Sequence, residues 1–448
     1  MHDHSIDAAV ASDSFDIYLS EISKIEGAAS LALVVRNNTI KELKFSISEW
    51  KRFYTQAIRG KHAIAIPQLV ARICGTCSNA HLLASIIAIE NAYRITPSPQ
   101  TVLLRKLLYN GLILRDHALH LYIFALPDLF GKNSLLDFDE NDPVQHELLD
   151  DAFEVKEVGN LLSIVIGGRS VHAPYPTIGG FTRLPALDEI KQLKSKLTAA
   201  RPKVLHLIDI FAHAPFTQTL SKPIMYSCLK TDDFSFLTGV IQTSTGAVIQ
   251  PDKLGDHLDG VIIPYSHARG FTFEGNLLMT GAMARLNIMQ SALHQKTRES
   301  VQNYLSVFPS QNIFHNNLAQ AIEVLHVLDV SIDTIDSLTT VENESPVRFQ
   351  PQAATGIGVI EAPRGTLYYK LDIDASGVVI RGDIIVPTGQ NQIVMERGIY
   401  ELVEKLLPSH PTQEIIINEI EKFIRAFDPC MSCAAHFLKV KWNGKYLQ

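Results

Sequence analysis

The sequence predicts a predominantly helical α+β fold, in which a large, bundle-like helical core carries small antiparallel β-sheets near the N-terminus and around residues 366–387. Long stretches with apolar side chains at helical spacing fill much of the chain, which is the main signal of helices that pack on one another. Short apolar runs bounded by turn residues occur near the start and again after residue 366, as expected for hairpins. The sequence shows no internal repeat or low-complexity segment, so we expect one large interwoven unit.

Composition places the chain among globular proteins. It has 448 residues, of which 46% are apolar and 19% charged, enough to bury a large core. The net charge of −7 and the lack of a basic patch argue against nucleic acid as a partner. No apolar run approaches the roughly 18 residues of a transmembrane helix, and residues 1–14 lack the apolar core of a signal peptide. Five cysteines in so long a chain do not form a disulfide framework, which favours a reducing compartment.

The first half of the chain is expected to contain one hairpin followed by a series of helices. Residues 1–14 are predicted to be a flexible tail. The runs 30–35 and 40–47 flank an Asn-Asn turn and predict a hairpin. Apolar residues at helical spacing then predict helices over residues 49–68, 81–93, 100–125, 143–166 and 186–212.

The second half is expected to end in a sheet and a helix. Residues 216–300 carry mixed signals, and residues 311–341 again follow a helical pattern. Strand-like runs at residues 367–373, 378–381 and 384–386 predict a small antiparallel sheet that carries two loops. The last helix, residues 412–427, directs one apolar stripe toward the core: Ile416, Ile420, Phe423, Ile424 and Phe427.

The cysteines form two pairs near opposite ends of the chain. Cys74 and Cys77 make one Cys-x-x-Cys pair, and Cys430 and Cys433 make the other. Two thiols three residues apart can bind one metal from a single turn of chain. We therefore predict that the two pairs close on one metal centre, and that Cys228 is an ordinary buried thiol.

Two simpler interpretations compete with this one. A single Cys-x-x-Cys pair is also typical of a redox-active dithiol, and two pairs are typical of a tetrahedral structural zinc site, which the ligand count alone favours. The flanking residues favour a different centre. His81 and His436 follow the pairs by four and three residues, and an Asp-Pro step precedes the second pair. A closed zinc site needs none of these neighbours.

The flanked motifs are Arg-Ile-Cys-Gly-x-Cys-x-x-x-His from residue 72 and Asp-Pro-Cys-x-x-Cys-x-x-His from residue 428. Together they resemble the large subunit of nickel–iron hydrogenases, and the resemblance extends over most of the chain. It implies that four thiolates hold nickel, for which soft sulfur ligands are suitable. Cys77 and Cys433 would also bridge to an iron that carries carbon monoxide and cyanide, while Cys74 and Cys430 would bind nickel alone.

The resemblance assigns roles to two residues beside the thiols. Glu26, in Ile-Glu-Gly, would be the first proton acceptor outside the metals, and burial raises the pKa of a carboxyl group toward the range useful for proton transfer. His81 would donate a hydrogen bond to a thiolate and so tune the metals. The alternatives are an exposed glutamate beside a turn glycine and a histidine that caps a helix.

The resemblance also implies which residues line the open side of the metals. Asp116, in an Asp-His-x-x-His helix, would lie over that side; the alternative is a plain contact between helices. Arg364, in Pro-Arg-Gly, would hang above the metals and pair with Asp116 or Asp428 through its fixed donors. It would polarise H2 or act as an auxiliary base, and Asp116 and Asp428 would orient it. Pro363 and Thr388 would contact the cofactor, Thr388 by a hydrogen bond to a cyanide.

The resemblance further implies a magnesium ion bound by His436 and by the backbone carbonyl of Ile384. The sequence departs from the family pattern at two places. Thr55 stands where the family has a carboxylate ligand of this ion, and a hydroxyl is a poor ligand for a hard cation. Three alternatives stay open: the ion is held otherwise, it is absent, or a different ion occupies the site; Thr55 is not assigned as a ligand. Residues 389–391, Gly-Gln-Asn, stand where the family has Trp-Asn, which affects the shape of the loop expected there and not the site.

The implied function is that of a hydrogenase catalytic subunit, which cleaves H2 reversibly and heterolytically into protons and electrons. The Cys430 thiolate would take the proton and pass it to Glu26. The chain has no further cysteine motif for an iron–sulfur cluster, so we expect an iron–sulfur small subunit as electron acceptor. Further electron-transfer subunits, a maturation protease and metal-insertion proteins are the other expected partners. We expect the complex in the cytoplasm, or at a membrane through its partner subunits.

Residues 15–436 are expected to form one domain. In the family the mature chain normally ends at the last motif histidine, so we expect residues 437–448 to be an extension that a protease removes. Three alternatives remain open. They are an H2-sensing hydrogenase, a non-catalytic helical scaffold stapled by a four-cysteine zinc site, and a subunit of the respiratory NADH dehydrogenase type, whose members lack the four cysteines.

Overall fold

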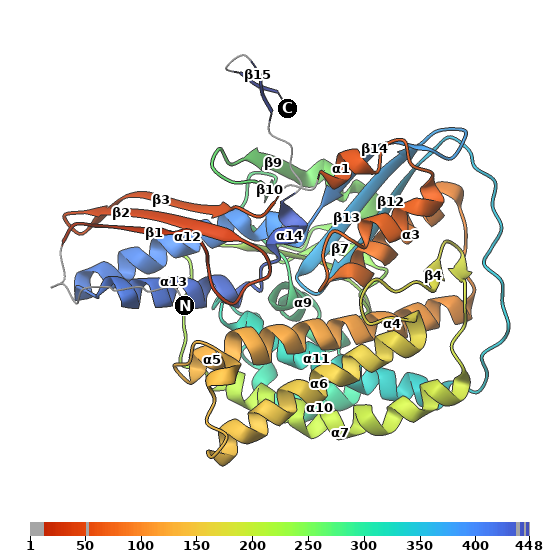
Figure 1. Cartoon of the computed structure of the whole chain (residues 1–448), viewed down its shortest axis with the longest axis horizontal. Coiled ribbons are helices and arrows are strands. Elements are labelled where there is room, and N and C mark those ends of the chain that lie inside the picture. Colours follow the sequence, from red (N-terminus) through yellow and green to blue (C-terminus); the bar gives the residue numbers. More distant parts are fainter. Residues whose placement is uncertain (1–12, 51–52, 436–439, 443–444, 448) are drawn as a thin grey trace.

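The computed structural model describes residues 13–50, 53–435, 440–442 and 445–447, and it combines a helical core with several small sheets (Figure 1). This is the fold class that the sequence predicts. Among the described residues, no helix combines the length and the hydropathy that crossing a bilayer requires.

The long helices form a bundle in the lower half of Figure 1. Figure 1 shows its long helices side by side: α4 (Pro99–Ala118), α6 (Pro143–Gly167), α7 (Leu187–Ala212) and α11 (His315–Ser337). Local sequence explains where two of them begin. The Ser98 side chain accepts a hydrogen bond from the Thr101 N–H, and the Asp142 side chain accepts one from the Val144 N–H. A proline follows each cap at the first helical position, where no backbone donor is needed.

A three-stranded antiparallel sheet lies against helix α3 above this bundle. Its strands run in the order β12 (Ala354–Ala362), β13 (Gly365–Ile373) and β14 (Val379–Ile385), and α3 spans Ser78–Tyr93. Gly358 allows the close approach, because a Cβ there would lie 2.2 Å from the backbone oxygen of Ala84 in the helix.

The turn between β12 and β13 is the part of this sheet that matters for the site. Ala362 pairs with Gly365, so Pro363 and Arg364 are the two residues of the turn. Gly365 has φ +129°, and a Cβ on it would lie 2.5 Å from a methyl carbon of Thr280. The motif glycine is therefore required for the backbone that presents Arg364.

A second antiparallel sheet is formed near the N-terminus by β1 (Phe15–Leu19), β2 (Ala29–Arg36) and β3 (Thr39–Ile47). It contains the predicted hairpin, and β1 was not predicted. Asp13 and Ser14, expected in the tail, are bonded to the hairpin turn, since the Asn38 N–H donates to the Asp13 carbonyl and the Asn37 N–H to the Ser14 hydroxyl. The division of the chain into tail, domain and extension stays a prediction.

The remaining elements are short or surround these parts. The other helices are α1 (Tyr54–Ala57), α2 (Ile66–Val70), α5 (Leu126–Leu129), α8 (Leu254–His257), α9 (Ala282–Met289), α10 (Gln295–Leu305), α12 (Pro387–Leu406), α13 (Gln413–Ala426) and α14 (Met431–Ala434). The other strands are β4 (Pro176–Thr177), β5 (Gly180–Phe181), β6 (Met225–Lys230), β7 (Val240–Thr243), β8 (Val248–Ile249), β9 (Leu258–Ile262), β10 (Arg269–Phe273), β11 (Leu278–Met279), β15 (Val440–Trp442) and β16 (Lys445–Leu447).

Most predicted helices are present, with shifted ends. Helix α3 begins three residues before His81, so this histidine lies inside the helix and does not open it. The helix predicted over residues 100–125 is not α-helical throughout, because residues Leu119–Ala125 form a π-helical turn, η2. All five apolar side chains predicted to face the core from residues 412–427 are buried.

Three local predictions are wrong. The helix expected over residues 49–68 is broken, because Gly60 adopts φ +74° after α1 and its N–H bonds the Val379 carbonyl instead of continuing a helix. Residues 389–391 are not a loop: Pro387 starts helix α12, and these three residues are buried in its first turns. The two runs predicted at residues 378–381 and 384–386 belong to one continuous strand, β14, which covers Val379–Ile385.

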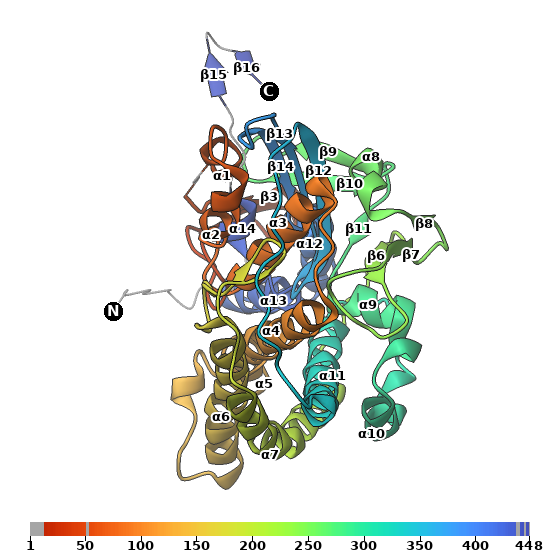
Figure 2. The same cartoon turned by 90° about the vertical axis from the view of Figure 1, so that its right-hand side faces the viewer.

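Segments near the two ends of the sequence meet beside the β12–β14 sheet, where Glu26 pairs with Cys430. Helix α13 leads into α14, and Figure 2 shows α14 beside α2 and α3. Segments from the beginning and the end of the sequence therefore share one buried region.

Candidate metal centre

Four cysteine sulfurs meet in this region. The Sγ atoms of Cys77 and Cys433, 356 residues apart in sequence, lie 3.0 Å from each other. The Sγ atoms of Cys74 and Cys430 lie 3.3 Å apart, and all four sulfurs are within 4.8 Å of one another. All four residues are buried and none forms a disulfide. The prediction that the two pairs close on one centre is confirmed.

Backbone geometry at each end directs the thiols inward. Cys77 immediately precedes the first residue of α3 and occupies its N-cap. At the other end, Asp428 adopts φ +49°, a left-handed conformation that aspartate tolerates better than most residues. The chain therefore turns sharply after α13, and the short helix α14 carries Cys433 back toward the first pair.

The charges of the thiols show what the cluster can hold. A hydrogen bond from Cys430 lowers the pKa of Cys74 well below its ordinary value. Burial is the largest factor that raises the pKa of Cys430 and of Cys433. Four thiolates cannot share so small a buried space without compensating positive charge. A metal centre supplies that charge and deprotonates its thiol ligands, so the four cysteines fit a thiophilic metal centre.

Glu26 lies against the second pair. Its backbone pairs with that of Cys430 as a short parallel bridge, and its carbonyl accepts the Met431 N–H. The carboxyl oxygen Oε2 lies 2.9 Å from the Cys430 sulfur and accepts the Ser432 N–H at 3.2 Å. Burial is the main cause of its raised pKa, and the Cys74 thiolate raises that pKa further. Gly27, with φ +78°, permits this approach, because a Cβ there would lie 3.0 Å from the Cβ of Met431.

His81 contacts a sulfur from inside α3. Its Nε2 lies 3.4 Å from the Cys433 Sγ, and its Nδ1 lies 2.7 Å from the Tyr369 hydroxyl. A hydroxyl can donate to Nδ1, which leaves the Nε2 proton directed at the sulfur. The partner Tyr369 was not found from the sequence.

Arg364 is held between two carboxylates. Its Nη1 donates to Asp116 Oδ2 at 2.9 Å, and its Nη2 donates to Asp116 Oδ1 at 3.2 Å and to Asp428 Oδ1 at 2.9 Å. All three residues are buried. Burial lowers the pKa of Arg364, but Asp116 and Asp428 outweigh it, so the guanidinium stays charged. Its Nε–H has no hydrogen-bond partner among the described residues.

A buried ionic cluster stabilises the turn between β12 and β13 that carries Arg364. The Arg285 guanidinium is 0% exposed and donates to Glu323 and Glu361 at 2.6–2.7 Å. It also donates to the carbonyl oxygens of Ala362 and Pro363. This cluster was not predictable from the sequence. Only Glu361 had a signal, its position before the Pro-Arg-Gly motif.

Thr388 joins the C-terminal pair to α12. Its hydroxyl oxygen accepts the Cys430 N–H at 2.9 Å, so the hydroxyl proton remains available to another acceptor. A small cavity next to the sulfurs is lined by the residues predicted to face the cofactor and by their neighbours: Cys77, His81, Ala362, Pro363, Arg364, Leu367, Pro387, Thr388, Cys430 and Cys433.

The remaining predicted residues stand as follows. Ile384 lies in β14, opposite Tyr369 of β13. Thr55 is half-buried in α1. His436 lies outside the described residues, so the magnesium ligands stay a prediction. Cys228 is fully buried, and burial raises the pKa of its thiol, as expected for an ordinary buried cysteine.

The fold and the site together define a class of protein in which four cysteines, drawn from both ends of the chain, can hold one metal centre. A family model described as nickel-dependent hydrogenase matches residues 52–149 and 258–436. The chain belongs to this family and is a hydrogenase catalytic subunit, an oxidoreductase that acts on H2.

Known relatives cover nearly the whole chain. Sulfhydrogenase 1 subunit alpha of Pyrococcus furiosus is 30% identical over 95% of this chain and 98% of its own length. Sulfhydrogenase 2 subunit alpha of the same organism is 31% identical over 95% of this chain and 100% of its own length. Both relatives are named as alpha subunits. Among solved structures, an NAD+-reducing [NiFe]-hydrogenase in the H2-reduced state shares the fold with a TM-score of 0.85, 23% identity, and coverage of 95% and 100% of the two chains.

Proposed function

We propose that this chain cleaves H2 heterolytically at a nickel–iron centre, H2 ⇌ 2H+ + 2e−, with the Cys430 sulfur as the first proton acceptor and Glu26 as the second. The observation that carries the proposal is the 2.9 Å contact between the Cys430 Sγ and the Glu26 Oε2. A thiolate and a carboxyl group in hydrogen-bond contact can exchange one proton without any rearrangement of the chain.

The four thiolates would hold the metals, with Cys74 and Cys430 on nickel and Cys77 and Cys433 shared with iron. When bound, the metals supply the electrophilic centre for H2 and the route by which its two electrons leave. The protein's part is to receive the proton. The Cys430 Sγ takes it, the Glu26 carboxylate takes it from the sulfur, and the half-buried position of Glu26 lets it pass outward.

Arg364 would polarise H2 above the sulfurs or act as an auxiliary base, and Asp116 and Asp428 would orient it. Its plane is fixed by two carboxylates, Asp116 and Asp428, and its Nε–H, which has no hydrogen-bond partner among the described residues, remains a fixed donor. A lysine could not make these three contacts, because an ammonium group has no planar fork.

Carbon monoxide and cyanide on iron would occupy the cavity beside the sulfurs. Its lining includes the apolar ring of Pro363 and two residues that carry donors, Thr388 and Arg364. Apolar walls suit carbon monoxide, whereas a bound cyanide accepts hydrogen bonds through its nitrogen. His81 would tune the shared thiolate of Cys433 through its contact with the sulfur.

A magnesium ion bound by His436 and the Ile384 carbonyl would tie the last motif to β14. Thr55 lacks the carboxylate that a hard cation prefers, so this ion needs another oxygen ligand here. The expected partners are an iron–sulfur small subunit, further electron-transfer subunits, a maturation protease and metal-insertion proteins. The complex would work in the cytoplasm or at a membrane through those partners.

Two other functions share features of the site. An H2 sensor would use the same residues at low turnover. A zinc-stapled scaffold would use the four thiolates but would need neither Glu26 beside Cys430 nor Arg364 between two carboxylates.

Infrared spectroscopy of the purified complex tests the proposal. Iron-bound carbon monoxide and cyanide absorb in a spectral window that is free of protein bands. We expect bands from both ligands, which shift when H2 is added. A complex that contains its metals but shows no such bands would refute the proposed centre.

A further inference from the structure

His120 stands out among the buried histidines because both of its ring nitrogens face hydrogen-bond acceptors. It lies in η2, one turn after Asp116, and is 1% exposed. Its Nδ1 lies 2.5 Å from the Gln320 Oε1, and its Nε2 lies 2.8 Å from the carbonyl oxygen of Arg425. A carbonyl oxygen only accepts hydrogen bonds, so the Nε2 position requires a proton.

The Nδ1 position requires a proton for a different reason. The Gln320 amide also contacts Asp428, whose other oxygen is paired with Arg364. A carboxylate only accepts, so the amide must present its NH2 group to Asp428 at 2.9 Å and its oxygen to His120. A neutral imidazole carries one ring proton, and this site requires two.

We infer that His120 is a buried imidazolium that, through Gln320, holds Asp428 in place against Arg364. His120 does not touch the sulfurs and is a positioning residue. Its importance for turnover rests on the proposed role of Arg364, whereas its protonation state does not.

The charges of the connected side chains agree with this assignment. Arg364 is joined by hydrogen bonds to Asp116 and Asp428, and Asp428 is joined through Gln320 to His120. Two carboxylates and one guanidinium leave an excess negative charge in a buried group, and an imidazolium removes it. Buried charges are tolerated when they are paired and hydrogen-bonded in this way.

The position of His120 at a helix end agrees as well. Arg425 lies in the last turn of α13, where the carbonyl groups carry the negative end of the helix dipole and favour a cation. The Arg425 guanidinium does not fill this role, because it turns away to Asp128. The imidazolium thus binds the end of the helix that delivers Asp428 and the second cysteine pair.

If His120 lost a proton from Nδ1, the amide of Gln320 would have to turn over to supply a donor. Its oxygen would then face the Asp428 carboxylate, and that oxygen–oxygen contact is repulsive. The second proton on His120 therefore locks the amide in one orientation and Asp428 in one position.

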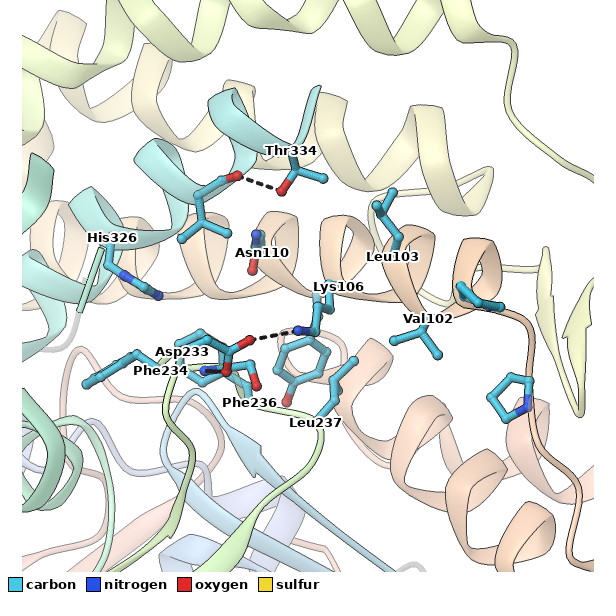
Figure 3. Close-up of a pocket in the computed structure, with 15 residues that line it drawn as sticks. Val102, Leu103, Lys106, Asn110, Asp233, Phe234, Phe236, Leu237, His326 and Thr334 are labelled. Carbon is cyan, nitrogen blue, oxygen red and sulfur yellow. Dashed lines mark hydrogen bonds and ion pairs between the residues drawn. The ribbon is translucent and has the colours of Figure 1, made fainter. Parts of the chain in front are cut away.

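Neutron diffraction from deuterated crystals of the complete complex counts these protons directly. His326 is the internal control. It is buried and lines a cavity of about 530 Å³ between α4 and α11 (Figure 3). Its Nδ1 accepts the His294 N–H at 3.0 Å, and burial lowers its pKa to about 4, so it carries one ring deuteron. We expect two ring deuterons on His120 and one on His326. One deuteron on His120 would overturn the inference.

A pair of variants tests the positioning role. His120→Gln should lower the turnover of H2 roughly tenfold or more while nickel and iron remain bound, as for loss of other residues that orient a metal site. His326→Gln should stay within about twofold of the wild type. Wild-type turnover in His120→Gln would overturn the positioning role. If the variant does not fold, the deuteron count on the wild type still decides the protonation state, and it does so even if the complex has no hydrogenase activity.

Discussion

The Cys430 sulfur and the Glu26 carboxyl group lie 2.9 Å apart, although 404 residues separate them in sequence. The contact is held by the backbone as well, through the hydrogen bond from the Met431 N–H to the Glu26 carbonyl. A thiol and a carboxyl group of raised pKa are thus fixed side by side at the edge of a four-sulfur cluster.

Removing the carboxylate should stop proton transfer and leave the metals in place. We expect Glu26→Gln to lower H2/D+ exchange by at least about a hundredfold, the usual contribution of one well-placed acid–base group. Glutamine keeps the shape and can still accept the Ser432 N–H, but it does not take up a proton.

The matched control for this change is Glu42→Gln. Glu42 is an exposed residue of β3 that pairs with Lys44, and its substitution should leave exchange unchanged. The account of Glu26 fails if Glu26→Gln exchanges H2 with D+ at the wild-type rate.

Replacing Arg364 by lysine tests whether the planar guanidinium group, hydrogen-bonded to Asp116 and Asp428, is required. Lysine keeps the positive charge but cannot bond both Asp116 oxygens and Asp428 together, so we expect turnover to fall by roughly a hundredfold with nickel and iron content unchanged. Arg381→Lys, an exposed change on β14 where Arg381 pairs with Asp372, is the control. Equal turnover in both variants would show that only the charge of Arg364 matters.

Because His326 is buried, we expect the free energy of unfolding to depend on pH. Burial lowers its pKa from 6.5 to about 4, so the unfolded chain takes up a proton first as the pH falls, and stability is lost from about pH 6.5 down to 4. Between pH 7 and pH 4 the wild type should lose about 3 kcal/mol more than His326→Gln. Urea unfolding at each pH measures this difference, and parallel losses in the two proteins would contradict the prediction.

The predicted removal of residues 437–448 can be checked by mass. We expect the metal-loaded subunit to end at His436, and intact-mass measurement on the active complex gives the end directly. An active, metal-loaded chain that retains Gln448 would show that this extension is not removed.

Motifs explain how much of the site was predictable. The cysteine pairs and the Pro-Arg-Gly turn are short segments whose residue types indicate a metal site. Their proximity in the folded chain could therefore be predicted without coordinates. The residues that hold those segments in place could not be predicted from the sequence. Arg285, Gln320 and Tyr369 reach the site through contacts that only tertiary structure creates, and each stands in an ordinary local sequence.

The same limit applies to the fold. The long helices were predictable because their apolar periodicity is strong. Strand β12 was missed because glycines such as Gly358 interrupt its pattern, and those glycines are present for packing against α3. Helix α12 was missed because Gly389 and Asn391 indicate a turn, whereas Pro387 and burial of the first turns determine a helix.

The measurement that tests the central claim most directly is the metal content of the purified complex with and without single cysteines. We predict one nickel and one iron per chain in the wild type and in Cys228→Ser, whose thiol is buried away from the cluster, and loss of both metals in Cys433→Ser. Zinc as the sole metal, or nickel and iron that survive the loss of Cys433, would contradict the account.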